Sequence, residues 1–395
     1  MLDFEEALAR LLAGASPVRE TQAVPTQAAA GRILAQGLRS PIDVPPLDNT
    51  SMDGYAVRCA DVPAAGTRLV VGQRIPAGSV GLVLAAGTAA RIFTGAPLPA
   101  GADAVVMQEL CAVDNGSVTV NHLPRPGEWI RRRGEDIAAG SEVLAAGTRL
   151  SAAHVGVAAS VGAAQLTVFR RLRVALFSTG DELAMPGEPR KPGGIYNSNR
   201  YTLRALLEGL GCEVADLGIV PDSRDATRAA LREAAAANDL ILTSGGVSVG
   251  EEDHVKPAVE AEGALDLWKI AIKPGKPLAF GRVGAAAFIG LPGNPVSSFV
   301  TFIMLVRPFI LKAQGASSVS PRAQALRADF DCKGDPRREF LRARVNAQGG
   351  LDLFANQSSG VLTSCTWADG LIDNPPGQAI RRGDTVRFLS FSELL

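Results

Sequence analysis

Paired cysteines and clustered histidines are missing from this chain of 395 residues. The five cysteines are scattered and form no C-x-x-C pair, so neither a disulfide framework nor a structural zinc site is expected. The three histidines are also far apart in the sequence, which argues against a histidine-based metal site.

The chain also lacks an excess of charge and a long apolar run. Lys plus Arg equals Asp plus Glu at 40 each, which gives no reason to expect nucleic-acid binding. The longest strongly apolar segment, residues 299–306, is ended by Arg307 and Pro308 and is too short for a membrane span. The acidic, amphipathic N-terminus is unlike a signal peptide. We therefore expect a cytoplasmic protein that binds neither nucleic acid nor membrane.

Periodicity and composition divide the chain into four parts. Residues 1–45 and 137–170 mix helix and strand and are expected to form one split domain. Residues 46–136 consist of short β-like pieces between Gly, Pro and Asn turns, typical of an inserted mostly-β module. Residues 171–316 alternate strands with helices, which predicts a doubly wound α/β domain with a mostly parallel sheet. Residues 317–395 predict a small, barrel-like all-β domain.

Several elements are predicted from the spacing of apolar residues and from capping residues. Residues 3–13 have helical spacing, and residues 26–35 are expected to form a second helix capped by Thr26. Residues 269–273 alternate Lys and Ile, which predicts one strand with both lysines on the same face. In the α/β part, strands are expected at 173–177, 213–220, 239–243 and 287–289, and helices at 199–210 and 223–237.

Polar turns follow four of the predicted strands. The most informative turn, T-S-G-G-V-S-V-G-E-E-D at 243–253, has two glycines that can direct backbone amides at an anion and three acids that suit a divalent cation. The others lie at 178–183, 221–223 and 290–297. Any one of them could be an ordinary strand-to-helix turn. Because open α/β sheets bind ligands at the carboxyl ends of their strands, we expect the four to share a site.

Lysines could supply the positive charge that a polyanion needs. Lys269 and Lys273 are expected beside the third turn, although a solvated edge strand would also carry lysines that discourage aggregation. The β module adds polar turns at 46–56 and 91–99, and a charge run at 131–136 that by itself is typical of a solvated face.

Eight stretches of the chain carry a family resemblance. They are S-M-D-G-Y-A (51–56), F-T-G-A-P (93–97), G-E-D (134–136), S-T-G-D-E-L (178–183), S-G-G-V-S (244–248), K-P-G-K-P (273–277), L-P-G-N-P (291–295) and E-F-L-R (339–342). In this order and over nearly the whole chain, they resemble the MoeA-type molybdopterin molybdenumtransferases. The α/β part alone also resembles the adenylyltransferase that acts one step earlier.

The resemblance implies an enzyme of molybdenum cofactor synthesis. Such enzymes take adenylylated molybdopterin and molybdate, insert the metal at the dithiolene and release AMP, assisted by a divalent cation, usually Mg²⁺. The family, to which the gephyrin E domain is related, forms elongated homodimers of four-domain subunits. The active site then lies between the α/β domain of one subunit and the β module of the other. The molybdopterin adenylyltransferase is a further expected partner.

Motif matching also implies the site residues. Glu182 and Asp253 are the candidates for holding the cation and orienting an attacking oxygen, and Lys269 and Lys273 for steadying molybdate or phosphate. Asp53 is the catalytic candidate of the β module. The implied substrate contacts are Thr94, Asp136, Thr179, Gly180, Asp222, Ser244, Gly245, Gly246, Ser248, Lys276, Pro292, Gly293, Asn294 and Pro295.

Two other functions are compatible with parts of this pattern. Adenylyl transfer would consume ATP, and the extra β module argues against it. A protein that only holds the pterin or anchors a partner would bind product without turning over AMP, and the acids and lysines retained in the loops argue against that. No Ser-His-Asp or Cys-His arrangement is suggested, so a covalent acyl intermediate is not expected.

Overall fold

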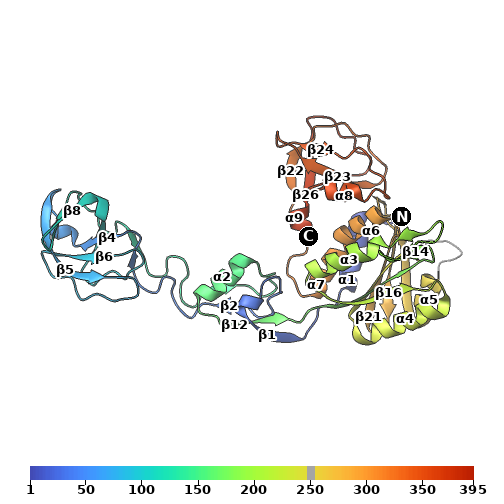
Figure 1. Ribbon diagram of the computed structural model, residues 1–395, viewed down its shortest axis with the longest axis horizontal. Coiled ribbons are helices and arrows are strands. Elements are labelled where there is room, and N and C mark those ends of the chain that lie inside the picture. Colours follow the sequence, from blue (N-terminus) through green and yellow to red (C-terminus); the bar gives the residue numbers. More distant parts are fainter. Residues whose placement is uncertain (247–253) are drawn as a thin grey trace.

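The protein is elongated in the computed structural model, which describes residues 1–246 and 254–395 (Figure 1). The β module lies at one end and a small unit of helix and paired strands lies in the middle (Figure 1). The α/β domain and the C-terminal domain form the larger other end. This is the multidomain α/β-plus-β architecture expected from the sequence.

A six-stranded sheet forms the centre of the α/β domain. Its first four strands are mutually parallel, and the fifth strand is antiparallel to both of its neighbours. The order is β16 (Glu213–Val220), β13 (Arg173–Thr179), β17 (Leu240–Ser244), β21 (Ala286–Leu291), β20 (Pro277–Val283) and β18 (Gly263–Lys269). The four predicted strands are confirmed at the first four places.

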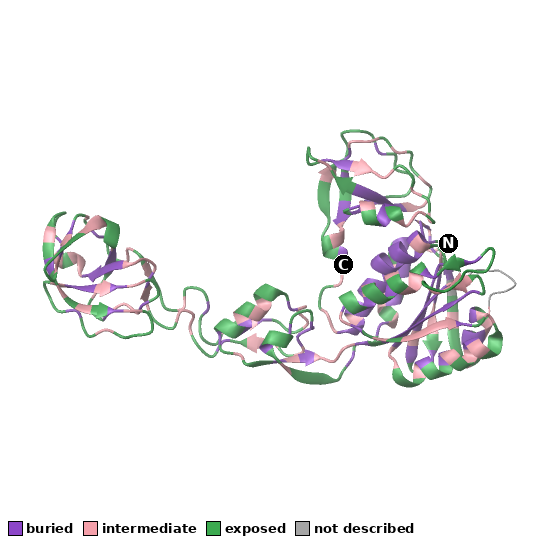
Figure 2. Cartoon of the chain, viewed as in Figure 1, coloured by how far each residue is buried: buried purple, intermediate pink, exposed green. Residues whose placement is uncertain are grey.

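Helices cover both faces of this sheet, which makes it doubly wound. Successive residues of β17 alternate between two cores, with Leu240 and Leu242 in one and Ile241 in the other. Buried residues are accordingly concentrated in the strands of this sheet and in the helices that pack on it (Figure 2). The first core includes residues of α3 (Ser198–Gly209), α6 (Pro295–Thr301) and α7 (Arg307–Ala313). The second includes residues of α4 (Arg224–Ala237) and α5 (Val255–Glu262).

The first predicted helix is confirmed as α1 (Phe4–Gly14), and Asp3 caps it by accepting a hydrogen bond from the Glu6 N–H at 2.8 Å. Phe4 and Leu11 are buried in the same core as α3 and α7. The helix therefore packs with the α/β domain, although the proposed boundary assigns residues 1–45 to the split domain.

The segments before and after the β module pair with each other in the middle unit. β1 (Thr21–Pro25) pairs with β12 (Gln165–Phe169), and β2 (Leu38–Arg39) pairs with β11 (Glu142–Leu144). The helix α2 (Ala152–Ser160) is capped by Ser151. This pairing is the split arrangement expected from the sequence.

The β module contains its own six-stranded sheet and is joined to the middle unit by paired chain segments. β3 (Asn49–Thr50) pairs with β10 (Ile130–Arg131) at that connection. In order, the strands of the sheet are β7 (Ala104–Met107), β4 (Gly54–Val57), β6 (Thr88–Ile92), β5 (Thr67–Ile75), β9 (Ser117–Val120) and β8 (Cys111–Asp114).

The C-terminal sheet takes in a short strand from the middle of the chain. Its order is β19 (Ile272–Lys273), β23 (Arg338–Val345), β25 (Gly370–Asn374), β26 (Thr385–Ser390) and β22 (Gln324–Arg327), with β24 (Leu351–Leu353) beside β23. Two short helices, α8 (Thr363–Trp367) and α9 (Phe391–Leu394), accompany it.

The prediction of one strand over residues 269–273 is wrong. Lys269 ends β18 of the α/β sheet, whereas Lys273 belongs to β19 of the C-terminal sheet. Ile270 forms an isolated bridge with Leu2 between them. The two lysines therefore do not share one strand face, because the chain crosses from one sheet to another.

The predicted helix over residues 26–35 is also wrong. Only one 3₁₀ turn, η1 (Thr26–Ala28), forms there, and Gly31 then has a φ of 76° that ends any helical course. Ile33 and Leu34 form β-bridges with Arg149 and Val168 instead. Long-range pairing has overridden the local helical pattern.

The apolar helical segment of the α/β domain is longer than predicted. Residues 299–306 continue through Arg307 and Pro308, because a π-helical turn, η4 (Phe302–Val306), joins α6 to α7 and Pro308 falls in the first turn of α7. Pro295–Ala313 thus has the length and hydropathy of a membrane span. However, 94% of the apolar window is buried in the protein, as in a core helix.

Gly54 of the S-M-D-G-Y-A motif allows β4 and β7 to pair closely, because a Cβ atom there would collide with the carbonyl oxygen of Val106. We expect Gly54→Ala to force the strands apart and lower the free energy of unfolding of the β module by about 1–3 kcal/mol. Urea unfolding monitored by circular dichroism measures the change. Gly72→Ala is the matched control, since the nearest atom to its Cβ lies 3.7 Å away on Thr88. Equal losses in both variants would contradict this explanation.

Candidate active site

A pocket of about 910 Å³ lies at the carboxyl ends of β13, β17 and β21. Three of the four predicted turns line it, together with the first turn of α3, the segment after β19 and part of the C-terminal domain. The predicted residues that line it are Thr179, Glu182, Ser244, Gly245, Lys273, Lys276, Pro292, Gly293, Asn294 and Pro295.

The other predicted turn, which contains Asp222, is not part of this lining in the described chain. It follows β16, which lies beyond β13 at the edge of the sheet. Lys269 is exposed and also lies outside the lining, opposite Pro277 in the β18–β20 pair. Three of the four predicted turns therefore meet at one pocket, whereas the turn with Asp222 and the residue Lys269 lie outside its described lining.

Glycines bring the β13 and β17 turns close together. Gly245 and Gly246 have φ values of 89° and 68°, which other residues rarely adopt. A Cβ atom on Gly245 would lie 3.0 Å from the carbonyl oxygen of Thr179. Gly180 likewise leaves room for the Glu182 carboxylate, since a Cβ atom there would lie 2.5 Å from its Oε2.

The L-P-G-N-P turn lines the pocket, but Pro295 and the residue after it offer no free backbone donor there. Pro295 has no N–H, and the N–H of Val296 already donates to the carbonyl of Ser359 at 3.0 Å. The Asn199 side chain donates to the carbonyl of Gly293 at 2.7 Å. The turn therefore joins α3, α6 and the C-terminal domain around the pocket.

Positive charge dominates the described lining. Lys273, Lys276 and Arg337 contribute cations, whereas Glu182 is the one carboxylate among the described lining residues. Lys273 and Arg337 also pair with Asp335, and Lys273 with Glu339, so the preference for an anionic ligand rests on the cationic donors that line the pocket rather than on a net positive charge.

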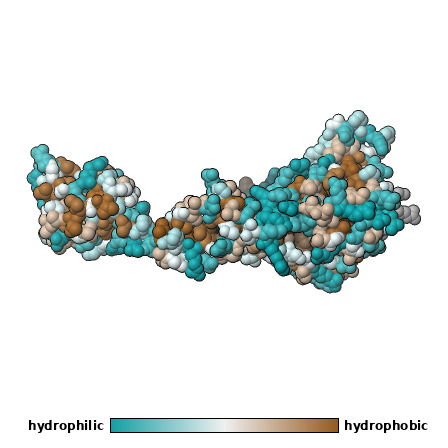
Figure 3. All heavy atoms as spheres, turned by 90° about the horizontal axis from the view of Figure 1, so that it is seen from below, coloured by the Kyte–Doolittle hydropathy of each residue, from teal (hydrophilic) through white to brown (hydrophobic). Residues whose placement is uncertain are grey.

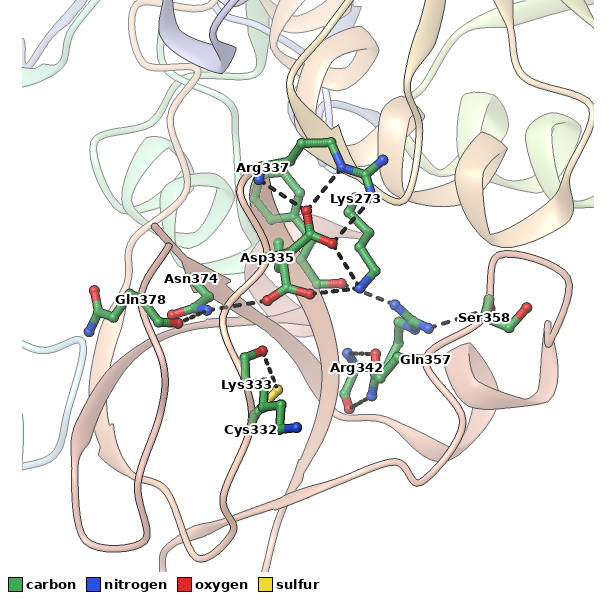
Figure 4. A network of polar contacts seen from close by, with 12 residues as sticks. Lys273, Cys332, Lys333, Asp335, Arg337, Arg342, Gln357, Ser358, Asn374 and Gln378 are labelled. Carbon is green, nitrogen blue, oxygen red and sulfur yellow. Dashed lines mark hydrogen bonds and ion pairs between the residues drawn. The ribbon is translucent and has the colours of Figure 1, made fainter. Parts of the chain in front are cut away.

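The C-terminal domain supplies lining residues that motif matching did not assign to the site. Arg337 precedes the E-F-L-R motif, and residues 357–360 form a loop at the pocket. Arg342 of that motif is 1% exposed and supports this loop, donating to Ser358 O at 3.5 Å and from its backbone to Gln357 Oε1 at 3.0 Å (Figure 4). Burial lowers the pKa of its guanidinium.

The polar residues at the start of α3 were also missed. Asn197 caps the helix, its Oδ1 accepting from the Arg200 N–H at 3.1 Å, and Ser198 and Asn199 line the pocket beside it. The sequence signal was present, because an N-S-N run before an apolar-periodic segment is typical of a helix start at a sheet edge.

The β module, which contains Asp53 and Thr94, lies at the other end of the molecule (Figure 1). Asp53 and Thr94 meet there, with Asp53 Oδ1 accepting from the Thr94 hydroxyl at 2.6 Å and from its backbone N–H at 2.7 Å. Asp136 is exposed and its N–H donates to the carbonyl of Val44 at 3.1 Å. One subunit therefore does not bring these residues to the pocket.

Two predicted residues, Ser248 and Asp253, lie outside the described residues. Among the described ones, no group of three His, Cys, Asp or Glu side chains is arranged to hold a metal ion. Within the described part of the lining, Glu182 supplies the one carboxylate, which suits a Mg²⁺ ion that takes some of its ligands from water and substrate phosphates.

Comparisons with known proteins cover nearly the whole chain. Residues 2–162 match the "MoeA N-terminal region (domain I and II)", 175–312 the "Probable molybdopterin binding domain" and 325–391 the "MoeA C-terminal region (domain IV)". The molybdopterin molybdenumtransferase of Haemophilus influenzae is 42% identical, with 100% of each chain covered. The chain belongs to the MoeA family.

Other relatives agree with this assignment. The Nostoc protein of the same name is 39% identical over 91% of this chain and 86% of its own. A crystal structure of the molybdopterin biosynthesis MoeA protein from Pyrococcus horikoshii OT3 aligns with a TM-score of 0.84, at 28% identity, and covers 99% of this chain and 100% of that one. The resemblance inferred from the motifs and the predicted fold class are therefore confirmed.

The Asp53–Thr94 pair offers a test of site geometry in this MoeA-family chain. The Thr94 hydroxyl and then its backbone N–H lower the pKa of Asp53. Such a carboxylate contributes stability above its unfolded pKa, and that stability is lost as the pH falls through the folded pKa. We expect Thr94→Val to raise the pKa of Asp53, as measured by NMR titration of its side-chain carboxyl. Thr94→Ser retains the hydroxyl and should leave the pKa low; a rise there would show that the hydrogen bond is not its cause.

Proposed function

We propose that this protein is a molybdopterin molybdenumtransferase. It transfers molybdenum from molybdate to adenylylated molybdopterin, with release of AMP. The observation that carries the proposal is a cation-lined pocket at the carboxyl ends of β13, β17 and β21, in a chain that is 42% identical over its full length to a protein of that name.

The charge of the pocket is suited to these substrates. Molybdate and the pyrophosphate link are both anionic, and Lys273, Lys276 and Arg337 provide fixed positive charge for them. Such preorganised charge is most effective where bonds to phosphate oxygens change in the transition state. Glu182 is the acid in the described lining that can orient an attacking oxygen at the phosphorus.

We propose Mg²⁺ as the assisting cation, with Glu182 and Asp253 as its protein ligands. When bound, Mg²⁺ would neutralise phosphate charge. The roles of Lys269, Asp222 and Asp136 in substrate binding, the contact with the molybdopterin adenylyltransferase and the cytoplasmic location remain predictions.

We further propose a homodimer in which the β module of one subunit completes the pocket of the other. Two observations support it. Asp53 and Thr94 pair within the β module, which lies at the opposite end of the subunit from the α/β domain (Figure 1). The β module has apolar patches on its surface (Figure 3), and its exposed apolar side chains include Val80, Leu82 and Val83 at 78%, 80% and 73% exposure.

The first test is AMP release from adenylylated molybdopterin with and without molybdate. We expect Glu182→Gln to reduce kcat by about 10²-fold or more, because a carboxylate at the reacting phosphate is lost. Asp181→Asn is the matched control, since Asp181 is the exposed neighbour and does not line the described pocket. An unchanged rate in Glu182→Gln would exclude the proposed role of Glu182, and ATP consumption without AMP release from this substrate would favour adenylyl transfer.

The shared site can be tested by mixing two inactive variants, Glu182→Gln and Asp53→Asn. A mixed dimer has one site with both changes and one with neither. Random exchange of subunits should therefore restore about a quarter of the wild-type rate, since half the dimers are mixed and half their sites are intact. If each subunit had a complete site of its own, mixing would restore no activity.

A further inference from the structure

Lys273 lies where the α/β domain and the C-terminal domain join. Its strand β19 pairs in parallel with β23, Lys273 being opposite Glu339, and the N–H of Arg338 donates to the carbonyl of Ala271 at 3.0 Å. The chain then turns through residues 274–277 into β20 of the α/β sheet. Lys273 therefore belongs to a strand of the C-terminal sheet and lines the pocket at the edge of the α/β sheet.

Two carboxylates of the C-terminal domain contact the Lys273 ammonium (Figure 4). Its Nζ lies 3.1 Å from Asp335 Oδ2 and 3.1 Å from Glu339 Oε1. The Lys273 side chain is 40% exposed, whereas those of Asp335 and Glu339 are only 17% and 3% exposed. The acids therefore stand behind the lysine rather than at the pocket surface.

Each carboxylate is itself held by a second group. Asp335 Oδ1 accepts from the side chain and the backbone N–H of Arg337, both at 3.0 Å. Glu339 Oε2 accepts from Asn374 Nδ2 at 3.4 Å. Because Arg337 holds Asp335 and Asn374 holds Glu339, the two carboxylates define one position for the ammonium.

This arrangement also keeps the lysine charged. Burial lowers the pKa of Lys273, but hydrogen bonds with Glu339 and Asp335 outweigh it, so the pKa lies above its ordinary value. The other charged groups of the described pocket are Arg337, Lys276 and Glu182. An ammonium group has three donors, and two of them serve the carboxylates. The third is not used by these two carboxylates.

We propose that Asp335 and Glu339 are positioning residues that hold the Lys273 ammonium at the pocket wall, so that the C-terminal domain sets where an oxyanion binds. The proposal rests on the proposed function, because it assigns Lys273 to the anionic substrate. It gives the C-terminal domain a part in the chemistry of the pocket.

Attachment of the C-terminal domain does not depend on these two carboxylates. Arg338 forms a bidentate pair with Asp373 at 2.6 and 2.7 Å and a contact with Glu5 at 2.6 Å. Its guanidinium also lies 4.4 Å from the centre of the Phe4 ring. This second cluster joins α1 to the C-terminal sheet, so loss of the Lys273 contacts should leave the domains docked.

The test uses full-length Asp335→Asn and Glu339→Gln, with Asp329→Asn as the matched control. Asp329 is also paired with an arginine, Arg327, at 2.8 Å, but it does not line the described pocket. Molybdate binding is measured by calorimetry, and the pKa of Lys273 by NMR of side-chain-labelled lysine. Asp335→Glu retains the charge and serves as the conservative variant.

We expect molybdate to bind about ten-fold more weakly to Asp335→Asn and Glu339→Gln, with a lower pKa of Lys273 and an unchanged unfolding midpoint for Asp335→Asn. Asp335→Glu should restore most of the binding, and Asp329→Asn should bind as the wild type does. Removing a negative charge without displacing the lysine would instead tighten the binding of an anion. Unchanged or tighter molybdate binding in both variants would therefore overturn the proposal.

The proposed function can fail separately. If molybdate binding weakens as expected but the wild type releases no AMP from adenylylated molybdopterin, the positioning role stands and the assigned reaction is wrong. If AMP release is normal and neither variant changes the pKa of Lys273 or molybdate binding, the positioning role is wrong and the reaction stands.

Discussion

The passage of one short segment between two sheets is the constraint on which the pocket depends. Residues 269–277 leave β18, pair with the N-terminus through Leu2, enter the C-terminal sheet as β19 and return to the central sheet as β20. This short segment thereby holds together the N-terminus, the central sheet and the C-terminal sheet. The same segment contains Lys273 and Lys276, two of the cationic side chains that line the pocket. It therefore both joins the two domains and supplies positive charge to the pocket.

The central sheet explains why polar side chains collect on the other wall. Parallel strands end at one edge, and their interiors are filled on both faces by alternating apolar residues such as Leu242 and Phe288. Polar side chains lie instead at the carboxyl ends of β13, β17 and β21. There the hydroxyls of Ser178 and Ser244 lie 3.1 Å apart, and the glycine turns begin.

Much of the fold could be predicted because it depends on local information. Caps such as Ser223 and Ser151 and the apolar strands of the α/β domain determine their elements within a few residues. Three of the four predicted polar turns meet at one pocket for the same reason. The family motifs added the β-module residues, whose placement near a pocket requires a second subunit and follows from no local pattern.

The failures have a common physical cause, which is pairing between distant segments. Residues 26–35 have a helical pattern, but Ile33 and Leu34 instead form β-bridges with Arg149 and Val168. Residues 269–273 alternate as in one strand, but their two ends belong to different sheets. Arg337 and the loop at 357–360 reach the pocket only because the C-terminal domain docks there. Spacing along the chain contains no information about such meetings.

The connection to the β module has an architectural consequence. The N–H of Val44 donates to the carbonyl of Ile137 at 2.8 Å, so the chain leaves for the module and returns from it at the same place. The strand pairs of the middle unit, β1–β12 and β2–β11, are formed by residues outside the segment between Val44 and Ile137. The β module is therefore a separate domain with its own cores. Changes in the two chain segments that connect it to the middle unit could alter its position relative to the pocket without changing the central sheet of the α/β domain.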